Sequence, residues 1–161
     1  GLSAAMKKSL ALLLLALCAP AGASTDGTGF TPLDRATAHS LTAPASHRQP
    51  TVVALWTSDC SYCKRNMRTL AALARGRPQL RIVTVAAETP SAATRPAIDK
   101  TGVPGKRYAY GDDVPEALAY ALDPTWRGEL PRTYLFDGRG GVQAASGVID
   151  AAALRTALKL R

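Results

Sequence analysis

The sequence predicts an α/β fold in which a central mixed β-sheet is flanked by helices on both faces. The first observation is the order of residues 52–56, 61–75 and 80–86, which form an apolar run, an amphipathic segment and a second apolar run. This order indicates a strand, a helix and a second, parallel strand. The second observation is a pair of strand-like segments, 132–137 and 142–148, separated by a glycine-rich turn. Such a pair indicates an antiparallel hairpin.

The first half of the chain begins with a segment that is harder to assign. Residues 30–50 mix Pro, Ser, Thr and Ala with little periodicity, so we expect a short hairpin or irregular cover, with strands near 30–33 and 38–41. The continuous apolar run 52–56 is typical of a strand that is buried on both faces. The helix 61–75 is then ended by a glycine and a proline.

The second half of the chain continues with alternating elements. Pro96 interrupts one predicted helix, Asp113 is a candidate cap for the next, and Asp150 is placed to cap the last. The expected elements are a helix at 91–100, a strand at 106–110, a helix at 114–122, the hairpin, and a helix at 151–160.

The N-terminal segment has the features of a secretory signal. A short basic start at Met6 precedes the apolar run 10–17, which is too short to span a bilayer. Small residues at 21–23 then fit a cleavage site before Ser24. We expect cleavage and export to the periplasm, with no stable membrane insertion afterwards; an uncleaved anchor is the alternative.

This interpretation divides the chain into two parts. Residues 1–23 are an N-terminal extension and cleavable signal peptide, and residues 24–161 are a single domain. Cleavage removes Cys18 and leaves Cys60 and Cys63 as the only cysteines. An exported chain with only these two cysteines has no other disulfide framework.

The formal charge of +8 comes from basic residues scattered through the chain. They are not interleaved with aromatic residues, so we expect no nucleic-acid partner. Lys64, Arg65 and Arg68 do cluster just after the cysteines. They serve either as a solvated helix face or as a positive field that favours a thiolate. Asp59 opposes that field, or caps the helix instead.

The C-x-x-C pair carries the chemistry. This spacing lets one helical turn bring the sulfurs of Cys60 and Cys63 within disulfide distance. Cys60 is placed at the helix N-terminus, where unpaired N–H groups stabilise a thiolate, and Cys63 lies one turn further in. A strand, a short loop, C-x-x-C and a helix predict a redox pair in which Cys60 attacks and Cys63 resolves the mixed disulfide.

Two other uses of the pair fit less well. A purely structural bridge across so small a loop restricts the unfolded chain little. A zinc site needs two more ligands at metal spacing, whereas His39 and His47 lie upstream in a loop-like stretch. We therefore expect no metal and no organic cofactor, since the disulfide itself carries two electrons.

Two segments resemble the exported thioredoxin-like proteins of the TlpA/ResA type, which are close to the thiol-disulfide proteins of cytochrome c maturation. These segments are 53–63, which includes the C-x-x-C motif, and 130–137, with the sequence LPRTYLFD. The resemblance extends over roughly residues 30–160 and implies a thioredoxin-like fold. It also implies a cis Leu130–Pro131 bond facing the disulfide. A cis proline turns the chain sharply and leaves neighbouring backbone groups free to pair with a substrate strand.

The resemblance further implies a substrate groove lined by Pro131, Leu130, Tyr62 and Trp56, although Trp56 is equally suited to the core. It implies a likewise exported, monomeric thiol-disulfide oxidoreductase that acts on protein disulfides as a reductant and is recycled by a redox partner protein. Two alternatives stay open. One is reduction of apocytochrome c thiols in cytochrome c maturation, and the other is a non-enzymatic copper-handling module.

The chain departs from the family at three positions. Asp59 replaces the usual aromatic residue before the first cysteine. Ala54 occupies the position of thioredoxin's buried acid, and Asn66 the position of a glutamate in the cytochrome branch. Neither Ala54 nor Asn66 can accept the proton of the Cys63 thiol. Glu88, at the end of the second central strand, is the nearest candidate acceptor, or else a surface residue that ends a strand.

Overall fold

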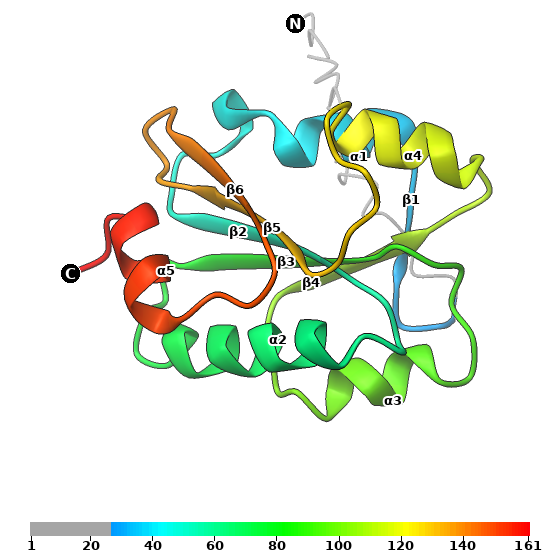
Figure 1. The fold of residues 1–161 in the computed structure, drawn as a ribbon, viewed down its shortest axis with the longest axis horizontal. Coiled ribbons are helices and arrows are strands. Elements are labelled where there is room, and N and C mark those ends of the chain that lie inside the picture. The colour runs from blue at the N-terminus through cyan, green and yellow to red at the C-terminus, as the bar shows by residue number, and fades with distance from the viewer. Residues whose placement is uncertain (1–26) are drawn as a thin grey trace, which may run out of the picture.

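The computed structural model describes residues 27–161 and has a six-stranded mixed sheet with helices on both faces (Figure 1). The strands lie in the order β1-β4-β3-β2-β5-β6. The predicted fold class is therefore confirmed. The elements are β1 (Thr31–Leu33), α1 (Arg35–Thr42), a 3-10 turn (Pro44–Ser46), β2 (Thr51–Trp56), α2 (Ser61–Ala74), β3 (Arg81–Ala86), α3 (Thr94–Asp99), β4 (Lys106–Tyr110), α4 (Pro115–Leu122), β5 (Arg132–Phe136), β6 (Val142–Ser146) and α5 (Ala151–Ala157).

Strand β2 lies inside the sheet. It pairs in parallel with β3 and antiparallel with β5, and all six of its residues are buried. Alternate side chains enter two separate apolar cores. Ala54 packs in the core beneath α2, α3 and α5, whereas Leu55 packs in the core beneath α1 and α4. Figure 1 shows these two helical layers on opposite faces of the sheet.

The segment before β2 differs from the expectation. Strand β1 pairs in parallel with β4 and not in a local hairpin. Residues 38–41, predicted as a strand, belong to helix α1. The Asp34 carboxylate accepts a hydrogen bond from the Thr37 N–H and caps the helix. Ala38 and Leu41, three residues apart, then face the same core, a spacing that fits one helical face.

Two predicted helix starts are also wrong. Helix α3 begins at Thr94, so Pro96 lies in its first turn and does not interrupt it. The N–H groups of a first turn have no partner inside the helix, so a proline there costs no hydrogen bond. Asp113 does not cap α4. Its carboxylate accepts from the Arg35 N–H at 3.3 Å and forms an exposed ion pair with the same residue. Asp150 does cap α5, as predicted, through the Ala153 N–H.

The outer strands of the sheet differ in length and exposure. Strand β1 has three residues and is mostly buried, whereas β6 is exposed along most of its five residues. Both hairpin strands end slightly earlier than the sequence suggested, at Phe136 and Ser146. The signal-peptide prediction for residues 1–23, including Cys18, lies outside the described residues.

Candidate active site

The cysteine pair forms a disulfide at the start of α2, with the two Cα atoms 5.3 Å apart. Cys60 is the residue that caps the helix, and its Sγ accepts a hydrogen bond from the Cys63 N–H at 3.1 Å. Cys60 is half-buried, whereas Cys63 is only 1% exposed. The pair is therefore asymmetric. The Cys60 sulfur is accessible and accepts a hydrogen bond from a helix N–H, whereas the Cys63 sulfur is enclosed.

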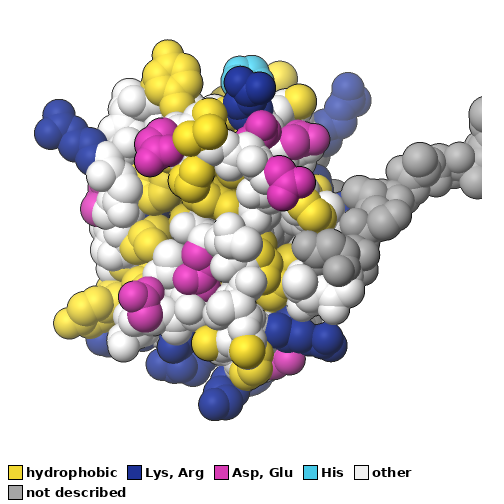
Figure 2. All heavy atoms as spheres, turned by 90° about the vertical axis from the view of Figure 1, so that its right-hand side faces the viewer, with side chains coloured by type: hydrophobic (Ala, Val, Ile, Leu, Met, Phe, Trp, Pro, Cys, Tyr) yellow, Lys and Arg dark blue, Asp and Glu magenta, His cyan; other side chains and the backbone are white. Residues whose placement is uncertain are grey.

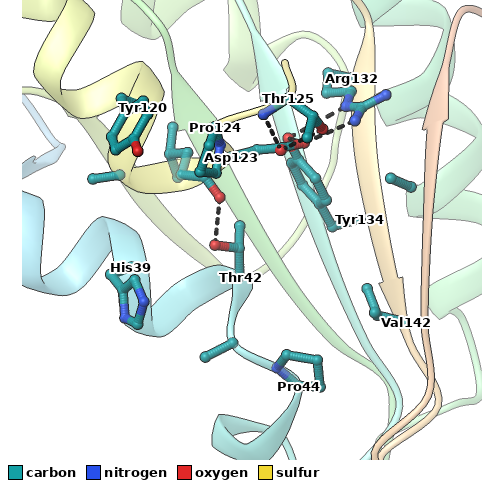
Figure 3. A pocket seen from close by; sticks show the side chains of 14 residues that line it. His39, Thr42, Pro44, Tyr120, Asp123, Pro124, Thr125, Arg132, Tyr134 and Val142 are labelled. Carbon is teal, nitrogen blue, oxygen red and sulfur yellow. Dashed lines mark hydrogen bonds and ion pairs between the residues drawn. The ribbon is translucent and has the colours of Figure 1, made fainter.

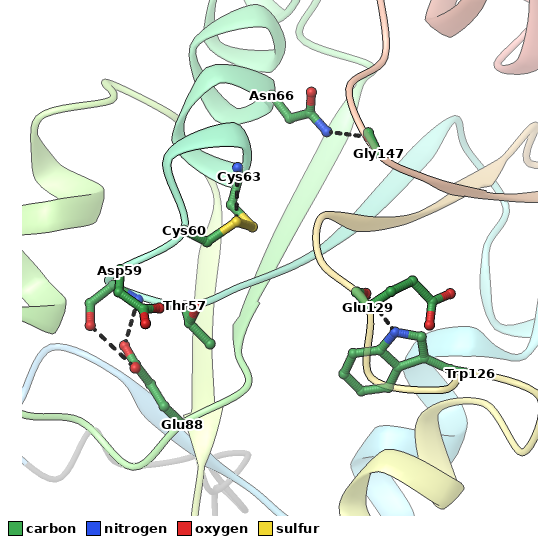
Figure 4. The surroundings of a disulfide bond; sticks show 10 residues. Thr57, Asp59, Cys60, Cys63, Asn66, Glu88, Trp126, Glu129 and Gly147 are labelled. Atoms are coloured by element: carbon green, nitrogen blue, oxygen red, sulfur yellow. Dashed lines mark hydrogen bonds between the residues drawn. A yellow bond between two sulfur atoms is a disulfide. The ribbon is translucent and has the colours of Figure 1, made fainter.

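A short loop, residues 57–60, carries the first cysteine; we call it the cysteine loop. Glu88, which follows β3, holds this loop in place. Its carboxylate accepts from the Ser58 N–H at 2.8 Å, from the Ser58 hydroxyl at 3.2 Å and from the Thr94 hydroxyl at 3.3 Å. Figure 4 shows the carboxylate pointing toward the loop and not toward Cys63. An anchoring role for Glu88 follows from these contacts, and its role as proton acceptor stays a prediction.

Asp59 does not cap α2. Its exposed carboxylate accepts instead from the Thr57 hydroxyl at 2.7 Å, within the cysteine loop. The capping position is taken by Cys60 itself. A negative charge thus remains on the residue that precedes Cys60, and it opposes formation of a second anion on that cysteine.

Asn66 joins α2 to the segment between β6 and α5. Its amide nitrogen donates to the Gly147 carbonyl at 3.0 Å (Figure 4). Its amide oxygen accepts from the Ile149 N–H at 3.1 Å. The residue is 5% exposed. A buried amide with both ends paired is a structural clamp, and a carboxylate could replace only its acceptor half.

The Leu130–Pro131 peptide bond is cis, as the sequence resemblance implied. The Pro131 carbonyl accepts from the Gly147 N–H at 2.9 Å. Gly147 thus bonds to Asn66 through its carbonyl and to Pro131 through its N–H. It has a φ of 87°, a conformation that suits glycine. The start of α2 and the cis proline are therefore linked through one backbone residue.

The predicted groove residues have different environments. Tyr62 is 63% exposed and Leu130 is half-buried, while Pro131 is buried. Trp56 is 0% exposed and packs against Phe30, with ring centroids 6.5 Å apart. Trp56 therefore lies in the core, which is the alternative that the sequence left open, because both faces of β2 are covered by helices.

A different tryptophan, Trp126, lies near the disulfide (Figure 4). It belongs to residues 123–131, which end at the cis proline; we call this segment the proline loop. Its indole N–H donates to the Glu129 carbonyl at 2.8 Å. Sequence analysis missed it. The available signal was an aromatic residue in a loop of Asp, Pro, Thr and Gly just before Pro131.

The proline loop is held by a charged network. Arg132, which follows Pro131, forms an ion pair with Asp123 at 2.8 Å, and the Tyr134 hydroxyl donates to the same carboxylate at 2.9 Å. Burial alone would raise the pKa of Asp123. Hydrogen bonds, led by that from Arg132 and joined by those from Thr125 and Tyr134, lower this pKa well below its usual value instead.

This network also reaches β6. Arg132 donates to the Ser146 hydroxyl at 3.0 Å, and that hydroxyl donates to Glu129 at 2.8 Å. Burial raises the pKa of Tyr134, and the Asp123 carboxylate adds to this rise. The Arg132 and Asp123 side chains are only 14% and 13% exposed, so solvent screens their interaction little.

A concavity of about 800 Å³ lies between α1, α4 and the β5–β6 hairpin (Figure 3). His39, Thr42, Tyr120 and Val142 line it, together with the ion pair of the proline loop. It is on the sheet face covered by α1 and α4, whereas Cys63 packs in the core on the other face. It is therefore a feature separate from the disulfide.

The two histidines have separate environments. His39 is exposed, and the buried His47 ring contacts the Leu41 carbonyl at 2.7 Å. Within residues 27–161, no group of three or more His, Cys, Asp or Glu side chains is arranged to hold a metal. Within the same residues, no helix is both long enough and apolar enough to cross a membrane.

Comparison with known proteins gives likeness in structure only. No family model matches the sequence, and no curated protein matches it. A secreted Mycobacterium tuberculosis disulfide oxidoreductase, homologous to E. coli DsbE, has a TM-score of 0.57 and 16% identity over 70% of this chain and 82% of that one. A thiol:disulfide interchange protein from Chlorobium tepidum has a TM-score of 0.57 and 14% identity over 82% and 87%.

A thioredoxin-related protein from Neisseria meningitidis has a TM-score of 0.54 and 21% identity over 69% of this chain and 83% of that one. These identities are low, so the likeness concerns architecture. In this chain that architecture is a six-stranded mixed sheet with helices on both faces. The chain therefore has a thioredoxin-like fold.

Proposed function

We propose that this chain is an exported thiol-disulfide oxidoreductase that reduces disulfides in protein substrates. The observation that carries the proposal is the asymmetry of the cysteine pair. The Cys60 sulfur is accessible and receives a hydrogen bond from the Cys63 N–H, while Cys63 is buried. A helix N–H stabilises a thiolate on the first sulfur, and an enclosed second sulfur reacts only with its neighbour.

The reaction proceeds in two exchanges. In the reduced protein the Cys60 thiolate attacks one sulfur of a substrate disulfide, forming a mixed disulfide and releasing the other substrate sulfur as a thiolate that takes up a proton. The Cys63 thiol then loses its proton and attacks Cys60 Sγ. The second substrate sulfur leaves, the Cys60–Cys63 disulfide forms, and two electrons have passed to the substrate.

The direction of exchange follows from the surroundings of Cys60. A strong oxidant has a reduced form that is stabilised by its thiolate. Here Asp59 directly precedes Cys60 in the chain, and its negative charge disfavours a thiolate on that cysteine. This charge favours the reducing direction, in which a redox partner protein resupplies two electrons to the oxidised pair.

Substrate contacts are assigned to the groove between the cysteine loop and the proline loop. Tyr62 is exposed beside the pair, and Leu130 precedes the cis bond. Because Pro131 is buried, an extended substrate would pair with the backbone around Leu130 more than with the proline ring. We assign no organic cofactor and no metal to this reaction.

Export is the second half of the proposal. We assign residues 1–23 to an N-terminal extension with a cleavable signal peptide and residues 24–161 to a single, monomeric periplasmic domain. A disulfide between the two remaining cysteines suits an oxidising compartment. Reduction of apocytochrome c is the narrower version of the same chemistry, and copper handling is the alternative from a different class.

The deciding experiment combines the reduction potential with two variants. A Cys60–Cys63 potential near roughly −270 mV supports a reductant, and one near roughly −120 mV contradicts that direction. Cys63→Ser should accumulate mixed disulfides through Cys60, because the first exchange survives and resolution does not. Cys60→Ser should abolish exchange. If neutral-pH alkylation of the reduced protein modifies Cys63 first, the assigned roles are wrong.

The same preparations test the copper alternative. The reduced wild-type protein and Cys63→Ser are titrated with Cu(I) against a competing chelator. The copper alternative is supported if the wild type binds Cu(I) tightly and stoichiometrically and exchanges slowly with every protein disulfide tried. That result would contradict the oxidoreductase assignment. Weak binding with rapid exchange supports it.

A further inference from the structure

A second concavity, of about 340 Å³, touches both segments that carry the redox site. Two of its lining residues connect it to the site. Thr57 begins the cysteine loop three residues before Cys60, and Leu130 immediately precedes the cis proline. Most of the remaining wall is apolar and comes from β4, α4 and the proline loop. These residues are Tyr110, Pro115, Ala119 and Trp126.

Two aromatic rings and one carboxylate give this concavity a specific chemistry. The Trp126 ring is held by its N–H bond to the Glu129 carbonyl. Burial raises the pKa of Tyr110 to about 12, and the Glu116 carboxylate contributes to the rise. Glu116 and Tyr110 both line the concavity. Aromatic faces and a carboxylate are the groups that bind an organic cation.

Glu116 differs from the other carboxylates near the redox pair. Glu88 is engaged by Ser58, Asp59 by Thr57, and Glu129 by Ser146. Glu116 is exposed in the first turn of α4, and within residues 27–161 its carboxylate takes part in no hydrogen bond or ion pair. Its charge is therefore available to a ligand in the concavity.

The charge around the concavity has the sign that a cation requires. The chain carries a net charge of +8. Figure 2 looks onto the end of the molecule where β2 and β3 pass into loops, and it shows hydrophobic side chains in the middle of this face with Asp and Glu side chains around them. The segments that follow the parallel strands β2, β3 and β4 and the segment that precedes the antiparallel β5 meet at this end of the sheet, and their acidic residues are Asp59, Glu88, Asp112, Asp113, Glu116 and Glu129.

We propose that this concavity, which we call the Glu116 pocket, binds the side chain of an arginine or lysine that flanks the reactive cysteine of the substrate. The aliphatic part of such a side chain would pack on Trp126 and Leu130, and its charged end would reach Glu116. The inference rests on the proposed function, because it places the cation next to a disulfide that the Cys60–Cys63 pair reduces. It defines a substrate class: disulfides with a basic neighbour.

The test uses three disulfide-bridged peptides that differ only in the residue flanking the reactive cysteine, which is Arg, Gln or Glu. The reduced protein should reduce the Arg peptide about three- to tenfold faster than the Gln peptide, and the Glu peptide most slowly. Glu116→Gln should lower the Arg-to-Gln ratio by about three- to fivefold. The ratio is measured within each variant, so a general loss of activity does not affect it.

Asp112→Asn is the matched control. Asp112 is exposed and lies four residues before Glu116, outside the pocket lining, and its substitution removes the same charge. It should leave the Arg-to-Gln ratio within about twofold of the wild-type value, because it changes only the long-range field. An equal fall in both variants would overturn the pocket in favour of general electrostatic attraction.

A binding measurement separates this inference from the proposed function. The oxidised protein is titrated calorimetrically with the Arg and Gln peptides in which both cysteines are replaced by serine. Tighter binding of the Arg peptide that is lost in Glu116→Gln supports the pocket even if no exchange occurs, in which case only the proposed function fails. Rapid exchange with equal rates and equal binding for the Arg and Gln peptides overturns the pocket and leaves the oxidoreductase intact.

Discussion

The cysteine loop and the proline loop line the same concavity, through Thr57 and Leu130, but are held by different chemistry. The cysteine loop depends on Glu88, which accepts from two groups of Ser58 and from Thr94, all of them neutral donors. The proline loop depends on a nearly buried ion pair, Arg132 with Asp123, that is extended by hydroxyl groups. A loop held by neutral donors can loosen at small cost, whereas breaking a buried pair leaves an uncompensated charge.

This difference suggests separate tasks. The proline loop presents a rigid surface to the substrate, because any movement would disturb a charge pair with little access to water. The cysteine loop must accommodate a disulfide, a thiolate and a mixed disulfide at the same position. An anchor made of several modest hydrogen bonds allows such adjustment. Four substitutions or conditions test this contrast, and they are described in decreasing order of expected effect.

Arg132→Ala should have the largest effect. It leaves the Asp123 carboxylate largely buried without its cation, which costs about 3 kcal/mol of unfolding free energy. Urea unfolding of the oxidised protein measures the loss. Arg139→Ala is the control, since Arg139 is exposed in the β5–β6 turn and its side chain has no ion pair in the described chain; it should cost less than about 0.5 kcal/mol. Similar losses of unfolding free energy in both variants would show that the Arg132–Asp123 ion pair does not stabilise the fold.

Asn66→Ala should have the next largest effect, about 2 kcal/mol, because it leaves the Gly147 carbonyl and the Ile149 N–H unpaired. Asn66→Glu should also destabilise, since a carboxylate accepts from Ile149 but cannot donate to Gly147. Thermal unfolding of the oxidised forms measures both. If Asn66→Glu is as stable as the wild type, the contacts of residue 66 adapt to a carboxylate. In that case the pH dependence of mixed-disulfide resolution would report whether this carboxylate acts on Cys63.

Glu88→Gln should cost less, about 1 kcal/mol, because the glutamine oxygen still accepts from Ser58. If Glu88 is only an anchor, resolution of the mixed disulfide should keep its dependence on pH. Stopped-flow resolution rates between pH 5 and pH 9 decide this. A profile displaced by the substitution would identify Glu88 as the proton acceptor of Cys63 and would remove the contrast between the two loops.

Acid should have the smallest effect above about pH 5. The folded-state pKa of Asp123 is lowered, so its stabilising contribution is fully present above the unfolded value of about 3.9 and is lost as pH falls toward the folded value. Unfolding free energies of wild type and Asp123→Asn should therefore run parallel from pH 7 to pH 5 and converge below about pH 4. Convergence already at pH 6 would contradict the lowered pKa.

Local patterns made much of the fold predictable. The runs of β2 and β3, the hairpin of β5 and β6 and the cap of α5 each depend on neighbouring residues or on turns of a few residues. Helix α1 was missed because Ala38 and Leu41 belong to a short segment without a strong period, and a distinction between helix and strand required its packing partner, α4. The cis bond was predictable through the resemblance of residues 130–137 to a known family.

The site was predictable at its cysteines and much less so around them. The bond from Glu88 to Ser58 joins residues thirty positions apart, and Asn66 bonds with residues more than eighty positions away. Sequence spacing carries no signal for such pairs. Trp56 could not be separated from a groove residue by sequence alone, because its burial depends on helices packed over both faces of β2.

Strand β6 has a consequence for the protein in concentrated solution. It is the last strand of the described sheet, and its residues, Val142 to Ser146, include neither a charged side chain nor a proline. The opposite outer strand, β1, is short and contains Pro32. Free backbone groups along an uncharged strand are a template for strands from other molecules. Self-association and precipitation of this protein should therefore begin at β6, and a lysine in place of Gln143 would keep it in solution.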